Sequence, residues 1–128
     1  TDPDNRRTYP WGNEDKQLLD FHKELIKIRN GNSVLNEGSC KFIYSDYGIV
    51  AVTRFDDKTA VTAGFNNLDT ETVSLPIWIA GVKTDGKAET LIESGSDYFI
   101  TDGKTYSVKE GYMDITVPAY GCIIVKSE

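Results

Sequence analysis

The order of hydrophobic and polar residues divides the chain into a polar start, one helical segment and a long series of short strands. Residues 1–13 are polar and rich in proline and glycine, which is typical of an irregular loop. Over residues 14–29 apolar side chains recur at steps of three and four, which predicts an amphipathic helix. From about residue 38 onward, short runs of β-branched and aromatic residues alternate with turn-forming residues.

The predicted helix has a wide apolar stripe and recognisable ends. Asn13 is the expected N-cap, and Glu14 and Asp15 follow where the helix dipole favours acids. Asn30 and Gly31 are expected to end the helix in a left-handed conformation. The stripe needs a sizeable packing partner, and its members are Leu18, Phe21, Leu25 and Ile28, flanked by Leu19, His22 and Ile26.

The remainder of the chain predicts an antiparallel sandwich, because many short strands are separated by regular turn signals. The expected strands are residues 40–45, 49–55, 59–65, 71–77, 88–92, 105–109, 113–117 and 122–126, with a loop at 78–86. A single helix before an all-β module of about 90 residues has no second helical layer to pack on. We therefore expect this helix to belong to a neighbouring domain, and alone to dock on the sandwich or to drive dimerisation.

Composition and charge exclude several classes of function. The net charge is -6, with 20 acidic and 14 basic residues, so no basic stripe can neutralise nucleic-acid phosphates. No apolar run approaches the roughly 20 residues of a membrane span. The cysteines Cys40 and Cys122 are interpreted as two buried thiols, with a disulfide between the first and last strands as the alternative. They are too few for a cysteine-rich zinc site, no calcium-loop spacing occurs, and no cofactor is expected.

Four stretches carry a resemblance to a known family. The segment D-P-D-N-R-R-T-Y-P-W over residues 2–11 resembles α-amylase-family glycoside hydrolases, especially the neopullulanase, cyclomaltodextrinase and amylopullulanase branch. Residues 21–29, FHKELIKIR, look like the eighth barrel helix of that family, and 32–38 are similar to its passage into the C-terminal domain. The ending V-P-A-Y-G-C-I-I-V looks like the last hairpin of that domain. Thr8 departs from the common Arg-Arg-Pro pattern.

The resemblance implies a fold and a division of the chain. It implies a mainly β fold, in which an antiparallel Greek-key β-sandwich follows a loop and one α-helix left over from the last unit of a (β/α)8 barrel. Residues 1–37 would be the end of the catalytic barrel, and 38–128 the C-terminal sandwich. Because TIM-barrel active sites lie on loops after the strands, residues 2–11 would belong to the active-site rim.

The resemblance also identifies candidate binding residues but no catalytic ones. Asp2 and Arg6 match family positions that line sugar subsites, where a carboxylate accepts from hydroxyls and a guanidinium donates. Their alternative role is to pair with each other and brace the loop. The catalytic Asp, Glu and Asp of the family lie upstream of the eighth strand and have no match here, so this chain alone is predicted to be inactive. His22 is interpreted as a helix-face residue that is packed or capped locally.

Aromatic residues support a rival interpretation, a stand-alone starch-binding or structural sandwich. Trp78 is a candidate for stacking on sugar, although its position between two isoleucines favours a core or interdomain role. Tyr9 and Trp11 are expected to pack the loop against the helix. In the intact parent the expected partners are an α-glucan and the catalytic barrel. Secreted or cell-surface placement is preferred over cytoplasmic.

Overall fold

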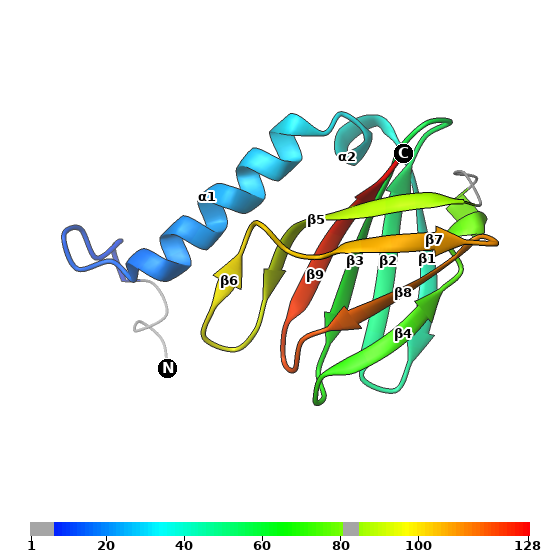
Figure 1. Cartoon of the computed structure of the whole chain (residues 1–128). Helices are drawn as coiled ribbons and strands as arrows, with labels where there is room; N and C mark the ends of the chain where they lie inside the picture. The colour runs from blue at the N-terminus through cyan, green and yellow to red at the C-terminus, as the bar shows by residue number, and fades with distance from the viewer. Residues whose placement is uncertain (1–6, 81–84) are drawn as a thin grey trace.

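A computed structural model describes residues 7–80 and 85–128 as one helix followed by a strand-rich body (Figure 1). The helices are α1 (Lys16–Gly31) and α2 (Val34–Glu37), and a 3₁₀ turn, η2, covers Ile77–Ala80. The strands are β1 (Ser39–Asp46), β2 (Ile49–Phe55), β3 (Ala60–Asn66), β4 (Glu71–Leu75), β5 (Gly86–Ser94), β6 (Phe99–Ile100), β7 (Thr105–Lys109), β8 (Tyr112–Val117) and β9 (Cys122–Ser127). No helix in the described parts of the chain is long and apolar enough to cross a membrane.

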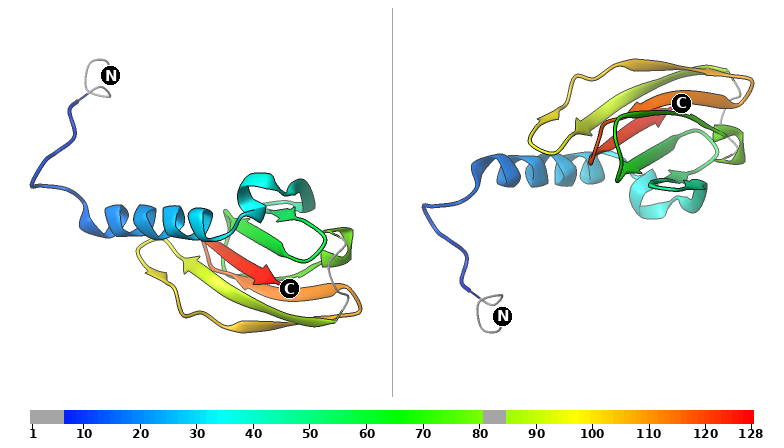
Figure 2. Two further views of the ribbon diagram at one scale, coloured as in Figure 1. Left: turned by 90° about the horizontal axis from the view of Figure 1, so that it is seen from above. Right: turned by 90° about the horizontal axis from the view of Figure 1, so that it is seen from below.

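The strands form one continuous antiparallel sheet that folds over itself into two layers (Figures 1 and 2). The hydrogen-bonded order is β1-β2-β3-β9-β5-β7-β8-β4, and β6 adds to β5. We call β1, β2, β3 and β9 the first layer, and β5, β7, β8 and β4 the second layer. The predicted antiparallel sandwich preceded by a loop and a helix is confirmed.

The core lies between the layers and is built from alternate residues of the strands. Ala51 in β2, Leu75 in β4, Met113 and Ile115 in β8, and Ile123 in β9 are all fully buried. Strand residues alternate between the two faces of a sheet, so each strand contributes every second side chain to this core.

The two layers approach each other closely. A Cβ placed on Gly64 of β3 would lie 3.4 Å from Ile115 Cδ1 and Val117 Cγ2 of β8. The η2 turn closes one end of the core with Ile77 and Ala80, where the sequence pattern predicted the end of a strand and a loop.

The helix α1 begins and ends two residues later than its sequence predicts. Asp15 is the N-cap, and its side chain accepts from the Leu18 amide at 3.0 Å, so the prediction of Asn13 as cap is wrong. At the other end Gly31 stays helical, and the Asn32 side chain donates to the Ile28 carbonyl at 2.7 Å. A side-chain amide, rather than a left-handed glycine, therefore terminates the helix.

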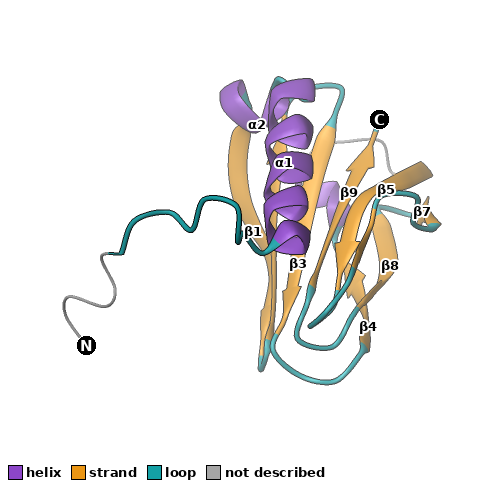
Figure 3. Cartoon of the chain, turned by 90° about the vertical axis from the view of Figure 1, so that its left-hand side faces the viewer, coloured by secondary structure: helices purple, strands orange, loops and turns teal. Residues whose placement is uncertain are grey.

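The short helix α2 packs on the sandwich, whereas α1 stands along its side (Figure 3). Val34 of α2 is buried at 3% exposure, and the Arg54 guanidinium of β2 donates to the Asn36 carbonyl at 3.2 Å. No residue of α1 is buried. That residues 1–37 belong to a barrel remains a prediction.

Both cysteines are free thiols in the structure. Cys40 lies on β1 and Cys122 on β9, and β2 and β3 separate these two strands in the sheet. At about 4.8 Å per strand, this separation is too large for a disulfide. The interpretation as thiols is confirmed, but neither is buried: Cys40 is exposed on the edge strand β1, and Cys122 is half-buried.

Candidate functional site

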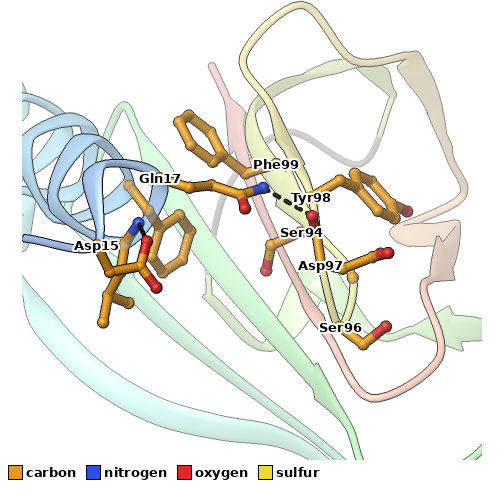
Figure 4. Close-up of a pocket in the computed structure, with 10 residues that line it drawn as sticks. Asp15, Gln17, Ser94, Ser96, Asp97, Tyr98 and Phe99 are labelled. Atoms are coloured by element: carbon orange, nitrogen blue, oxygen red, sulfur yellow. Dashed lines mark hydrogen bonds between the residues drawn. The ribbon is translucent and has the colours of Figure 1, made fainter.

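The helix α1 meets the sandwich at the β5–β6 hairpin, where a groove of about 230 Å³ lies between them (Figure 4). The side-chain amide of Gln17 donates to the Asp97 carbonyl at 2.6 Å. One turn further along α1, the rings of Phe21 and Phe99 have centroids 5.5 Å apart. These contacts hold the N-terminal half of α1 against a hairpin that is distant in sequence.

The rim of the groove is polar, and several of its groups make local hydrogen bonds. The Asp15 carboxylate is occupied by capping α1. The Tyr98 hydroxyl donates to Glu93 Oε1 at 3.4 Å, and partial burial together with the Glu93 carboxylate raises the pKa of Tyr98. Ser94 Oγ lies 3.2 Å from Cys122 Sγ. The groove therefore has hydroxyl and carboxylate groups around an aromatic floor of Phe21 and Phe99.

The loop before α1 leads away from the sandwich (Figure 2). The Tyr9 and Trp11 rings meet edge to face, with centroids 4.7 Å apart. Tyr9 lines a depression beside Leu18 and Leu19 of α1, as predicted. Trp11 is 84% exposed, so the expectation that it packs the loop on the helix is wrong.

The turn at the end of this loop, just before α1, is held by backbone and side-chain hydrogen bonds. The Glu14 carboxylate accepts from the Gly12 amide at 3.0 Å, and this bond lowers the pKa of Glu14. The residues predicted to bind sugar, Asp2 and Arg6, lie outside the described residues. Their subsite role therefore remains a prediction.

Trp78 lies on the η2 turn and points away from the core. Its amide donates to the Gly111 carbonyl at 3.0 Å, and its side chain is 52% exposed. Gly111 has φ of +80°, and a Cβ there would lie 2.7 Å from Trp78 Cβ, so only glycine fits beneath the indole. The expectation that Trp78 is a core residue is wrong for this chain. Its interdomain and sugar-stacking roles remain predictions.

His22, the single histidine of the sequence, is engaged within α1. His22 Nδ1 lies 2.8 Å from the Leu18 carbonyl, so this nitrogen carries the proton, and the expected local contact is confirmed. Within residues 7–80 and 85–128, no group of three or more His, Cys, Asp or Glu side chains could hold a metal ion. The geometry of these parts supports binding and packing roles.

Sequence reasoning missed the groove because it missed β6. Residues 94–100, SGSDYFI, carry a turn signal followed by aromatic residues, so a hairpin returning to β5 was detectable. Its contact with α1 was not, because pairing over such a sequence distance leaves no local pattern.

The fold, an antiparallel sandwich that follows a helix, matches the C-terminal β-sandwich domain of α-amylases. An α-amylase from Geobacillus thermoleovorans, solved in complex with acarbose, shares this fold with a TM-score of 0.76 at 19% identity. The match covers 98% of this chain and 26% of the α-amylase chain.

Sequence relatives narrow the class to a family. An amylopullulanase from Thermoanaerobacter thermohydrosulfuricus is 36% identical over 125 residues, which is 88% of this chain and 8% of that enzyme. An amylopullulanase from Thermoanaerobacterium thermosulfurigenes is 33% identical over 138 residues, covering 99% of this chain and 7% of the enzyme. The chain is homologous to a segment of these α-amylase-family glycoside hydrolases, and the resemblance is confirmed. It spans less than a tenth of the length of these relatives. No protein-family model matches it.

Proposed function

We propose that this chain is the C-terminal part of an α-glucan hydrolase that acts on starch, maltodextrin or pullulan. In this proposal the sandwich stabilises the catalytic barrel, and the loop of residues 1–13 contributes sugar subsites. The chain alone has no catalytic carboxylates and is inactive.

The observation that carries the proposal is the unburied helix α1. Its stripe of Leu18, Phe21, Leu25 and Ile28 is amphipathic, yet none of its residues is buried. Apolar helix faces are stabilised by burial against another element, and here the sandwich touches α1 mainly through the β5–β6 hairpin. Such a helix fits a position where a second domain covers its other side, as the relatives' much greater length allows.

The subsite role is assigned to Asp2 and Arg6. In an intact parent, removing a charge-assisted bond to sugar costs about 1.5–3 kcal/mol, which corresponds to a loss of roughly 10- to 100-fold in kcat/KM. We expect Asp2→Ala and Arg6→Ala each to lose this much activity on maltodextrin, with Asp4→Ala as a loop control. If the two residues only brace the loop, the double variant loses no more than either single one, and thermal stability falls with activity.

The second candidate function is glucan binding by the sandwich, which the exposure of Trp78 favours. Two assays on this chain separate the candidates: hydrolysis of soluble starch and pullulan, and calorimetry with maltoheptaose. No hydrolysis and no binding support the proposal. Binding that Trp78→Ala abolishes and Tyr112→Ala leaves unchanged supports the second candidate. Any hydrolysis by the purified chain contradicts the absence of catalytic carboxylates.

A further inference from the structure

Tyr98, in the turn of the β5–β6 hairpin, presents an aromatic ring at the surface in a fixed position. Its side chain is 43% exposed. The ring lies against Gly95, since a Cβ placed on that residue would overlap Tyr98 Cε1 and lie 3.0 Å from Cδ1 and Cζ. The Tyr98 hydroxyl donates to Glu93 Oε1 at 3.4 Å. Contacts at the ring and at the hydroxyl therefore hold the side chain while part of the ring stays open to solvent.

The hairpin that carries Tyr98 is itself anchored to α1. Its Asp97 carbonyl accepts from the Gln17 side chain at 2.6 Å, and the rings of Phe99 and Phe21 have centroids 5.5 Å apart. Figure 4 shows that Tyr98 projects from the hairpin on the side away from α1. The anchoring contacts and the exposed ring thus lie on opposite sides of the hairpin.

Two carboxylates accompany the ring. Burial raises the pKa of Tyr98, and the charges of Glu93 and Asp97 raise it further, so both carboxylates act on the hydroxyl. An ionised carboxylate has about four lone-pair sites for hydrogen bonds, and the Tyr98 hydroxyl occupies one on Glu93. A flat ring beside such acceptors suits a sugar, because the ring packs on the apolar C–H face and the carboxylates accept from the hydroxyls.

We infer that Tyr98, with Glu93 and Asp97, forms a surface platform for one glucose unit of an α-glucan, in addition to the residues proposed for the subsites. The inference rests on the proposed function for the identity of the sugar. Because the platform lies on the side of the hairpin away from α1, a domain packed on α1 leaves it open. A ring that is already held in position loses little conformational freedom when a ligand binds.

The test is a titration of the isotope-labelled chain with millimolar maltoheptaose, followed through the NMR shifts of backbone amides. A shallow platform leaves most of the ligand in solvent, so binding is too weak for calorimetry of the dilute chain. We expect saturable shifts over residues 94–100, and a loss of affinity of roughly fivefold for Tyr98→Ala. Tyr112→Ala is the matched control, since Tyr112 is 47% exposed, and it should leave the affinity unchanged.

Gly95→Ala separates the position of the ring from its presence. The added Cβ overlaps the ring, so the tyrosine must move although it is retained. We expect Gly95→Ala to weaken maltoheptaose binding, and to have no further effect when it is added to Tyr98→Ala. The amide signals outside the hairpin report whether each variant stays folded. Tyr98→Leu, which is apolar but not flat, should bind as weakly as Tyr98→Ala.

Three outcomes would overturn the inference. The first is an unchanged affinity of Tyr98→Ala, and the second is an equal loss in Tyr98→Ala and Tyr112→Ala. The third is a titration in which residues 94–100 do not shift; shifts confined to the surroundings of Trp78 would then support the second candidate function instead. The titration involves no catalysis, so a parent that fails to hydrolyse starch would refute the proposed function while the spectra alone decide the platform.

Discussion

The outer faces of the two layers differ in polarity: that of the second layer is polar, and that of the first layer is apolar. Across the second layer, the outward residues opposite one another on β4 and β8 are Thr72 with Thr116 and Ser74 with Asp114, and the two threonine hydroxyls lie 3.2 Å apart. At the matching places on the first layer, Val52 lies opposite Phe42 on one side and Ala63 on the other. Both layers contribute alternate residues to one core, so the core does not explain the difference.

The outer face of the first layer is therefore more apolar than that of the second. A sheet face that meets water is normally polar, and one that is buried is apolar. The polar second layer satisfies this expectation with no partner. The apolar first layer does not, and its partial covers, α1 and α2, lie on the same side (Figure 3).

The largest expected effect concerns Asn66, a side chain that links the end of β3 in the first layer to the end of β8 in the second. Asn66 at the end of β3 donates to the Asp69 carbonyl at 2.7 Å and to the Val117 and Pro118 carbonyls at 3.2 Å. Asn66→Ala leaves buried carbonyls without a donor, so we expect a loss of about 2–4 kcal/mol in the free energy of unfolding by urea. Asn67→Ala, an exposed neighbour, is the control. A loss below that of the control would show that the layers are held together elsewhere.

A smaller effect is expected for the contact between α1 and the β5–β6 hairpin beside the second layer. Phe99→Ala removes the ring contact with Phe21, and we expect amide exchange in α1 to accelerate roughly fivefold to tenfold, equivalent to about 1–1.4 kcal/mol. The midpoint of the sandwich should change little, because α1 contributes no buried residue. Ile100→Ala, on the same short strand, is the control. Unchanged exchange in α1 would show that the Gln17 bond alone holds the helix.

These contacts also show what the sequence could and could not predict. Alternation fixed most strands to within a residue or two, because each strand faces a core on one side. The apolar outer face also left a signal: β2 reads IVAVTRF with apolar residues at consecutive positions, whereas β4 reads ETVSL and alternates. Consecutive apolar positions indicate burial on both faces. The cap at Asp15 and the 3₁₀ turn around Trp78 were not predictable, because neighbouring residues were equally good candidates.

The two outer faces are compared directly by replacing a valine with threonine on the first layer and a threonine with valine on the second. Val52→Thr puts a hydroxyl into the half-buried outer face of the first layer, and we expect it to lower the free energy of unfolding of this chain by about 0.5–1 kcal/mol. Thr72→Val on the exposed second layer should stay within about 0.5 kcal/mol of the unsubstituted chain. Urea denaturation of both variants measures the difference. If Thr72→Val is the more destabilising, the outer faces do not differ as their residues indicate.

The smallest effect distinguishes the hairpins of the two layers by their response to acid. In the second layer, the turn between β7 and β8 is made by backbone conformation, with Glu110 at φ of 50° and Gly111 at 80°. In the first layer, Asp56 makes the turn between β2 and β3, and its carboxylate accepts from the Lys58 and Thr59 amides, both at 2.8 Å. These bonds lower the pKa of Asp56 below its ordinary value of 3.8.

A carboxylate with a lowered pKa in the folded state contributes stability above its unfolded pKa and loses it as pH falls through the folded one. We therefore expect Asp56→Ala to lower the thermal midpoint at pH 7 and to converge on the unsubstituted chain as pH falls below 3.8. Asp57→Ala, at the next position of the same turn, is the control and should lower the midpoint at pH 7 by less than Asp56→Ala does. If the difference in thermal midpoint between Asp56→Ala and the unsubstituted chain is as large at the lowest pH as at pH 7, the turn is held by the backbone, as in the second layer.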